Sequence, residues 1–239
     1  MTIREAHLLF RVLKDRVDSL AKEGFEAGEI DLFLNKAQLQ FVQQRLDLFN
    51  KRSSGFEASQ KRIDDLSTLV IKYPLQDGIT PILDQGVYEV PLSSLEYPYL
   101  RLISATADAT QNNCTKRTLL KFIQHDDYRD SLRDPFNSPS FEFIPFNFGR
   151  SSTDPSSSSI YIYPGSLSIS KVYLEYVKEP KKVSLGNYVY VDGTTLSPQE
   201  FELPPHTHEE IVSLAVLLAS LAIEDQGAQF KAQDYNLSE

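Results

Sequence analysis

The sequence is poor in the residues that most often carry chemistry. Among 239 residues it has a single cysteine, Cys114, no tryptophan and only 10 glycines. One cysteine excludes an internal disulfide and a metal site built from several cysteines. So few glycines argue against phosphate-binding loops, and the sequence contains neither G-x-G-x-x-G nor G-x-x-x-x-G-K-[ST].

Long apolar runs and positive clusters are missing as well. No stretch approaches the roughly 20 apolar residues that a membrane-spanning helix needs. The first residues include Arg4 and Glu5 in place of a continuous apolar segment, so we expect no signal peptide. The largest group of basic residues is Lys178 with Lys181 and Lys182. A phosphate-binding surface needs clustered lysine and arginine, so we do not expect tight nucleic-acid binding.

The charge is unevenly placed along the chain. The net charge is −9; residues 1–73 hold 12 basic and 11 acidic side chains, and residues 74–239 hold 12 and 22. The first part is therefore nearly neutral, while the remainder is acidic. An acidic wall of this kind repels DNA and would let it pass without sticking.

The histidines do not form a recognisable metal site. His206 and His208 stand in H-T-H-E-E, which differs from H-E-x-x-H, and residues i and i+2 at a helix start point apart. We interpret them as part of a helix entry. The cluster His125–Asp127 is expected on a solvated loop, and His7 at the edge of a helical apolar stripe.

Cys114 is a weak candidate for a nucleophile. Its neighbours Lys116 and Arg117 are basic, but no local Cys/His signature accompanies it, and a polar turn explains the segment equally well. The serines of 151–159 are not in a G-x-S-x-G motif. We therefore predict no catalytic residue, no metal, no cofactor and no small-molecule substrate, and hence no enzyme.

Apolar periodicity predicts two helices near the N-terminus. Residues 2–22 begin at a T-x-x-E capping box of Thr2 and Glu5 and carry one apolar stripe. Residues 29–50 form a second helix that is apolar over more than half of its circumference. Such a helix has to contact two layers: it is either the central helix of a monomeric bundle or a helix that also contacts another subunit.

Two more helices are expected, one short and one late. The short one covers residues 57–67. The late one follows Leu203-Pro204-Pro205, with Thr207 and Glu210 as a second T-x-x-E box. Residues 211–223 are apolar almost all round, so this helix should be buried against the first two.

The middle of the chain alternates as strands do, between turn-forming residues. Predicted strands cover 68–73 (ended by Pro74), 87–90, 99–105, 141–144, 146–148, 160–163 paired in a hairpin with 171–177, and 188–191, while 116–124 is either strand or short helix.

The fold class is therefore α+β: a helical bundle formed by N-terminal helices and a late C-terminal helix, with a β-rich domain inserted between them. We expect a helical connector domain of 1–67 with 204–226, a β-rich inserted domain of 68–203, and a C-terminal tail of 227–239.

Aromatic residues suggest contacts with other chains. The sequence has 14 phenylalanines and 12 tyrosines, and many fall on alternate faces of the predicted strands. A small β domain cannot bury two apolar faces by itself. The candidates for contacts with other subunits or partner chains lie on the second helix, on strand 171–177 and in the tail: Phe33, Phe41, Leu46, Phe49, Tyr173, Tyr176, Phe230, Tyr235 and Leu237.

Three segments resemble a known family. Residues 29–45 are similar to the second-helix motif of head–tail connector proteins of short-tailed phages, the portal-bound adaptor or tail tubular protein A-like family. Residues 172–180 resemble its strand ending in Lys-x-Pro, and residues 202–211 its entry into a buried last helix. The order of elements is most like that of the ring proteins of crAss-like phages.

The resemblance implies a structural virion protein made in the host cytoplasm and placed at the head–tail junction. It implies a ring of about twelve copies around a channel, because repeated heterologous contacts close into rings. The partners would be further copies, the portal, and the next tail or ring protein, with DNA only as passing cargo and no membrane. The alternatives are a soluble α+β protein-binding module acting as monomer or dimer, and an enzyme of an unrecognised family.

Overall fold

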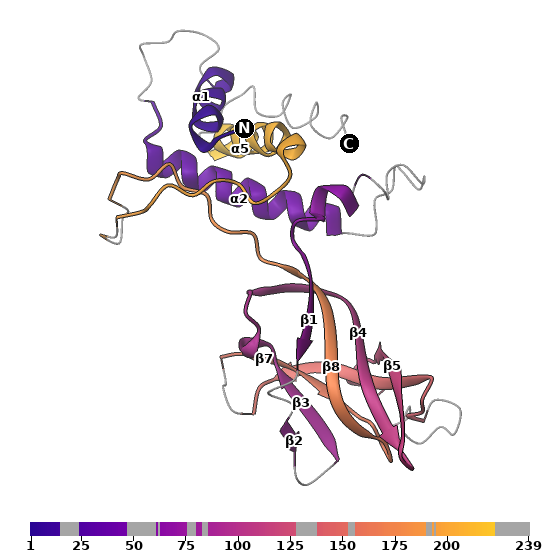
Figure 1. Ribbon diagram of the computed structural model, residues 1–239. Helices are drawn as coiled ribbons and strands as arrows, with labels where there is room; N and C mark the ends of the chain where they lie inside the picture. Colours follow the sequence, from indigo (N-terminus) through magenta and orange to yellow (C-terminus); the bar gives the residue numbers. More distant parts are fainter. Residues whose placement is uncertain are drawn as a thin grey trace. The chain divides into compact units, whose positions relative to one another are not determined.

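The computed structural model is an α+β structure of two compact units (Figure 1). One unit combines Met1–Leu69 with Pro180–Glu239, and the other is Val70–Glu179. Within them, the residues that the structure describes are 1–14, 24–46, 61, 63–75, 80–82, 86–127, 138–152, 156–189, 193 and 195–222. In these ranges no helix has both the length and the apolar character needed to cross a bilayer.

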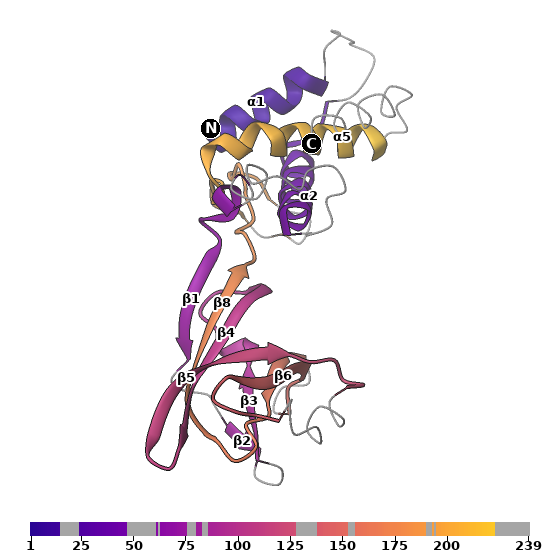
Figure 2. The ribbon, with the colours of Figure 1, turned by 90° about the vertical axis from the view of Figure 1, so that its right-hand side faces the viewer.

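Among its described residues, the first unit contains α1 (Ile3–Lys14), α2 (Ala27–Leu46) and α5 (His208–Ala222), with a further helical stretch at 63–66. Helix α5 packs against both α1 and α2 (Figures 1 and 2). Its apolar residues are buried on most sides, as its composition predicts. The predicted extensions of the first two helices through residues 15–22 and 47–50 lie outside the described residues. Of the helix expected over 57–67, the structure describes 61 and 63–67, and residues 63–66 are helical.

The two expected capping boxes behave differently. At α1, the backbone N–H of Thr2 donates to the Glu5 carboxylate (2.9 Å) and the N–H of Glu5 donates to the Thr2 hydroxyl (3.3 Å), so this box is confirmed. At α5 the prediction is wrong. The chain enters through a 3₁₀ turn, η2 (Pro205–Thr207), where the Thr207 hydroxyl donates to the carbonyl oxygen of Pro204 (2.8 Å).

The second unit is built on one mixed sheet, whose described strands run in the order β1-β8-β4-β5-β6-β7-β3-β2. Among these pairs only β5 with β6 is parallel. The strands are β1 (Val70–Leu75), β2 (Thr80–Ile82), β3 (Val87–Pro91), β4 (Tyr99–Gln111), β5 (Cys114–Phe122), β6 (Phe143–Arg150), β7 (Ser158–Ile162) and β8 (Ser168–Lys178). A short 3₁₀ turn, η1 (Leu92–Ser94), follows β3.

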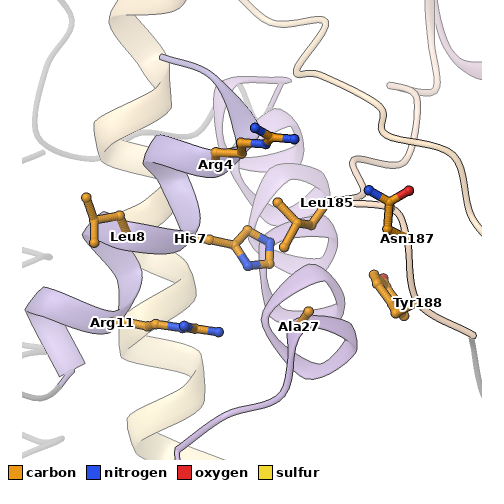
Figure 3. Close-up of a pocket in the computed structure, with 9 residues that line it drawn as sticks. Arg4, His7, Leu8, Arg11, Ala27, Leu185, Asn187 and Tyr188 are labelled. Atoms are coloured by element: carbon orange, nitrogen blue, oxygen red, sulfur yellow. The ribbon is translucent and has the colours of Figure 1, made fainter.

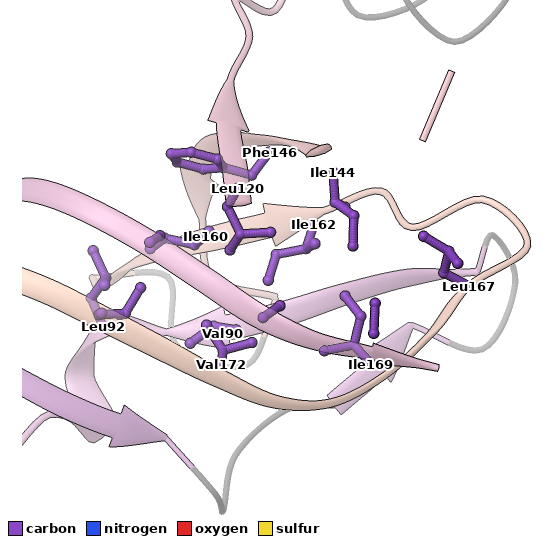
Figure 4. Close-up of a cluster of buried hydrophobic side chains, with 14 of the residues drawn as sticks. Val90, Leu92, Leu120, Ile144, Phe146, Ile160, Ile162, Leu167, Ile169 and Val172 are labelled. Carbon is purple, nitrogen blue, oxygen red and sulfur yellow. The ribbon is translucent and has the colours of Figure 1, made fainter. Parts of the chain in front are cut away.

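The core of this unit lies on one face of the curled sheet (Figure 4). Val172, Leu174 and Tyr176, which alternate along β8, point into it, and Ala105 with Ala107 do so from β4. Small side chains on β4 let the strand lie close to the apolar residues that face it. The core therefore follows directly from period-2 patterning.

Several strand predictions need correction. Pro74 lies inside β1 and does not end it, because β1 is an edge strand where a residue without an N–H loses no ladder bond. Segments 160–163 and 171–177 do not form a hairpin: β7 pairs with β6 and β3, and β8 pairs with β1 and β4. Residues 116–124, ambiguous from sequence, belong mostly to strand β5.

The chain returns to the helical unit earlier than the sequence pattern indicates. Residues 180–203, expected in the β-rich domain, belong to the unit that contains the helices. They form isolated bridges, Ser184 with Gln199 and Val189 with Thr195, in place of the strand expected at 188–191, of which 190 and 191 are not described. This segment positions the candidate site.

Candidate interaction site

A polar stripe on α2 holds the returning chain. Asn35 accepts a hydrogen bond from the N–H of Val183 (2.7 Å) and donates to the carbonyl oxygen of the same residue (2.9 Å). Gln38 donates to the carbonyl oxygen of Lys181 (2.9 Å). The side chains of Asn35 and Gln38 thus supply the hydrogen-bond partners that a neighbouring β-strand would otherwise provide. They fix residues 181–188 against the helix.

Asp31, one turn before Asn35, completes this stripe. Its carboxylate is 2% exposed and accepts hydrogen bonds from the N–H of Leu185 (3.0 Å) and from the Tyr188 hydroxyl. Nε2 of buried His7 lies 2.7 Å from the same carboxylate. A buried carboxylate is tolerated only with such partners, so Asp31 joins α1, α2 and the returning chain at one point.

A hollow of about 550 Å³ opens beside this junction (Figure 3). Arg4 and Arg11 flank it on the exposed side of α1, and neither forms an ion pair with a described residue. Leu8 between them is 64% exposed. The buried Nδ1 of His7, also in the wall, has no hydrogen-bond partner among the described residues. The complete lining is Arg4, His7, Leu8, Arg11, Ala27, Leu185, Gly186, Asn187 and Tyr188.

A second hollow, of about 270 Å³, shares Ala27 and Tyr188 with the first. Its other walls include Glu26 and the exposed side chains of Leu32 (54%) and Val189 (67%). We call the two hollows together the Tyr188 groove. It carries positive charge at the α1 end, negative charge at the start of α2, and exposed apolar side chains at both.

A second polar cluster connects the other end of α2 to α5. Arg45 donates to Asp65 (2.9 Å) and to Glu210 (2.5 Å), and its guanidinium lies 4.7 Å from the centre of the Phe41 ring. Burial by itself lowers the pKa of Arg45, but the two carboxylates outweigh burial and raise it. Nε2 of His206 lies 2.8 Å from Asp65. Glu210 therefore serves this cluster and not the predicted capping box.

The remaining candidates for chemistry also have structural surroundings. The His208 ring lies 2.8 Å from the carbonyl oxygen of Leu203 and 3.2 Å from that of Met1. Cys114 is exposed next to a turn, and His125 is exposed 3.3 Å from the Asn147 amide. Within the described ranges, no group of three or more metal-ligating side chains is gathered.

Glu89 is the buried carboxylate of the β unit. It is 2% exposed and accepts hydrogen bonds from the hydroxyls of Ser151 (2.8 Å) and Ser159 (2.8 Å), and from the N–H of Ser152 (2.9 Å). Burial raises the pKa of Glu89, but the serine hydrogen bonds outweigh burial and lower it. These bonds connect β3 with β7 and with the turn that follows β6.

The predicted contact residues that the structure describes fall into two groups, buried and partly exposed. Phe41 and Tyr176 are 0% exposed within the cores of their own units, so we remove them from the contact candidates. Phe33, Leu46 and Tyr173 are partly exposed and remain candidates. The other four lie outside the described residues: Phe49, Phe230, Tyr235 and Leu237.

Tyr173 lies on the outer face of the sheet in a polar setting. Its hydroxyl donates to Asp108 (3.0 Å), and the Arg117 guanidinium lies 3.9 Å from the centre of its ring. Arg117 also donates to Asp108 (3.2 Å). Leu119, two residues along β5, is 53% exposed. This face combines an ordered polar cluster with an exposed apolar residue, as interfaces often do.

Sequence reasoning missed the Asp31, Asn35 and Gln38 stripe. Four- and three-residue spacing places all three on one face of α2, and that spacing was visible in the sequence. We had interpreted this helix as apolar over more than half of its circumference. The polar residues on its buried face were therefore overlooked. Glu89 was similarly hidden in an alternating strand.

Together these features define a class of protein. The polar clusters join segments of the chain to one another, and the exposed groups are apolar side chains and unpaired charges, as in a protein that acts through contacts with other chains. A family model described as phage tail ring protein 3/4 matches residues 1–231. The chain belongs to this family, which confirms the resemblance to the ring proteins of crAss-like phages. It is a structural component of the phage tail. No curated protein matches the chain.

Proposed function

We propose that copies of this chain close into a ring at the head–tail junction, bound to the portal on one side and to the next tail or ring protein on the other. The family match, which covers residues 1–231 and therefore both units, carries this proposal. The ring has about twelve copies, and its centre is a channel through which DNA passes.

Ring closure needs two different surfaces on each subunit. The helical unit offers the Tyr188 groove and the partly exposed Phe33 and Leu46 of α2. The β unit offers the outer face around Tyr173 and Leu119. Exposed apolar side chains on both units support contacts with neighbouring chains.

The distribution of charge supports passage of DNA without binding. Residues 180–239 contain 9 acidic and 3 basic side chains, whereas residues 70–179 contain 13 and 10. Most of the excess of negative charge therefore comes from the returning segment, the last helix and the tail. Such a surface at the channel would repel the phosphate backbone.

Electron microscopy of the purified chain, alone and with its portal protein, tests the proposal. We expect closed rings with one copy number and an open centre, and a particle mass that matches that number. A monomer or dimer under both conditions would contradict ring assembly and favour the soluble protein-binding module.

A further inference from the structure

Part of the Tyr188 groove, on the exposed face of α1 and at Val189, takes no part in contacts among the described residues. Arg4 and Arg11 have no acidic partner among the described residues, while Leu8 and Val189 expose more than half of their surface. Leaving apolar side chains and uncompensated charges together at one hollow is typical of a surface that another chain covers. The groove therefore calls for an occupant that is partly apolar and carries charge of both signs.

We propose that the groove binds residues 227–239 of a second copy of this chain. The inference rests on the proposed ring, since it supplies one of the contacts between neighbouring copies. The segment reads G-A-Q-F-K-A-Q-D-Y-N-L-S-E and combines apolar side chains with one basic and two acidic residues.

The order of charges in the segment matches that of the groove. Asp234 is suited to Arg4 and Arg11, and Lys231 to Glu26 at the opposite end. A segment laid across Tyr188 would bring charge of the opposite sign to each end of the groove.

The apolar residues of the segment fit the same placement. Tyr235 and Leu237 lie next to Asp234 in the sequence. At the α1 end they would cover Leu8, and Phe230 beside Lys231 would cover Leu32. Burial of these exposed side chains would drive the association.

The segment lies beyond the last described helix. Helix α5 ends at Ala222, and Asp234 lies 12 residues further along the sequence. An extended chain of that length spans about 40 Å. Docking in a neighbour, and not in the same copy, makes the contact heterologous, so that it can be repeated around a ring.

Cross-linking between single-cysteine chains tests the inference, since the only native cysteine, Cys114, is exposed and replaceable. In a Cys114→Ser background, one chain carries Leu8→Cys and a second, size-tagged chain carries Tyr235→Cys. Mixed and mildly oxidised, they should give a disulfide-linked heterodimer. The matched control replaces Leu8→Cys by Lys36→Cys on exposed α2, and should give at least about threefold less product.

Charge variants add a second requirement. Arg4→Glu with Arg11→Glu should reduce the heterodimer at least about threefold, whereas Lys36→Glu should leave it unchanged. Equal yields from Leu8→Cys and Lys36→Cys would overturn the inference. The inference would also be overturned if a chain that carries both Leu8→Cys and Tyr235→Cys formed only a disulfide within itself, since the tail would then occupy its own groove.

Electron microscopy of the same samples separates this inference from the proposed function. Rings that form without the specific heterodimer would overturn docking of the tail and leave ring assembly standing. Heterodimer that forms without rings would support docking and count against ring closure.

Discussion

At the scale of single residues, buried carboxylates hold this protein together. Asp31 in the helical unit and Glu89 in the β unit are each 2% exposed and each accept several hydrogen bonds from distant parts of the chain. Their carboxylates accept from backbone N–H groups and hydroxyls. They are structural anchors, and removing them takes away an acceptor that several donors share.

Asp31→Ala should destabilise the helical unit by about 3–5 kcal/mol. The substitution leaves His7, the N–H of Leu185 and the Tyr188 hydroxyl without their shared acceptor. Urea unfolding followed by the helical circular dichroism signal measures the effect. Asp64→Ala, at an exposed position before the same unit's Asp65, is the matched control and should change stability little. Equal losses in the two variants would contradict the anchoring role.

Glu89 should make the stability of the β unit depend on pH. Because its pKa is lower in the folded state than the ordinary value of 4.5, the unfolded chain binds the proton more readily. Its contribution is therefore present above about pH 4.5 and is lost as the pH falls through the lowered pKa.

Glu89→Gln should remove this dependence and cost about 1–3 kcal/mol at neutral pH. Denaturant unfolding followed by tyrosine fluorescence across pH 2.5–7 would show the change as a flatter profile. Glu96→Gln, at an exposed position, serves as control. A variant with the same slope as the original protein would rule out Glu89 as the group responsible.

At the scale of elements, turn residues and the position of a strand at the sheet edge determine features of the strands that apolar patterning does not predict. The β4–β5 hairpin turns at Asn112 and Asn113, whose φ angles are +50° and +65°. Two successive residues with positive φ form a type I′ turn, which matches the twist of the flanking strands. Edge position likewise allows Pro74 within β1.

Substitutions at Asn113 should change the stability of the hairpin in opposite directions. Asn113→Gly should stabilise the β unit by up to about 1 kcal/mol, because glycine adopts positive φ without strain, while Asn113→Val should cost about 1–2 kcal/mol. Thermal unfolding of the pair measures this. Opposite signs are the essential result, and stabilisation by valine would contradict the turn assignment.

At the scale of the whole molecule, the proposed ring depends on contacts with other copies. Leu46 at the end of α2 is partly exposed, although it was predicted from an apolar pattern that also included the buried Phe41. Phe41→Asp would unfold the subunit and so cannot test assembly.

Leu46→Asp should reduce the fraction of chains in rings several-fold, since a charge on a covered surface costs binding free energy. Mass photometry counts the rings. Gln43→Asp, at an exposed position on the same helix, adds the same charge and should assemble normally. Circular dichroism checks that both variants remain folded. Normal assembly of Leu46→Asp would show that the end of α2 is not part of the interface.

DNA should be retained only weakly by the chain. Repulsion from the acidic residues of 180–239 and the absence of long basic clusters in the sequence leave little counterion release to drive binding. Filter binding should show weak retention at low salt that disappears at physiological salt. Tight retention at physiological salt would indicate a nucleic-acid-binding protein.

The sequence by itself determined the local elements and the family. Periodicity located α1, α2 and α5 and the strand that became β8, because helical and strand spacing depend only on the order of apolar residues. The motifs of residues 29–45, 172–180 and 202–211 led to the ring protein family that the match over 1–231 confirms.

Only the tertiary structure decided which segments pair and which side chains are covered. Strand pairing joins residues far apart in sequence, so alternation could not show that β8 pairs with β1 and β4 and not with β7. The groove at Tyr188 depends on Asp31 holding a segment more than 150 residues away. A hydrogen bond across such a separation leaves no periodic signal, because its two ends obey different local patterns.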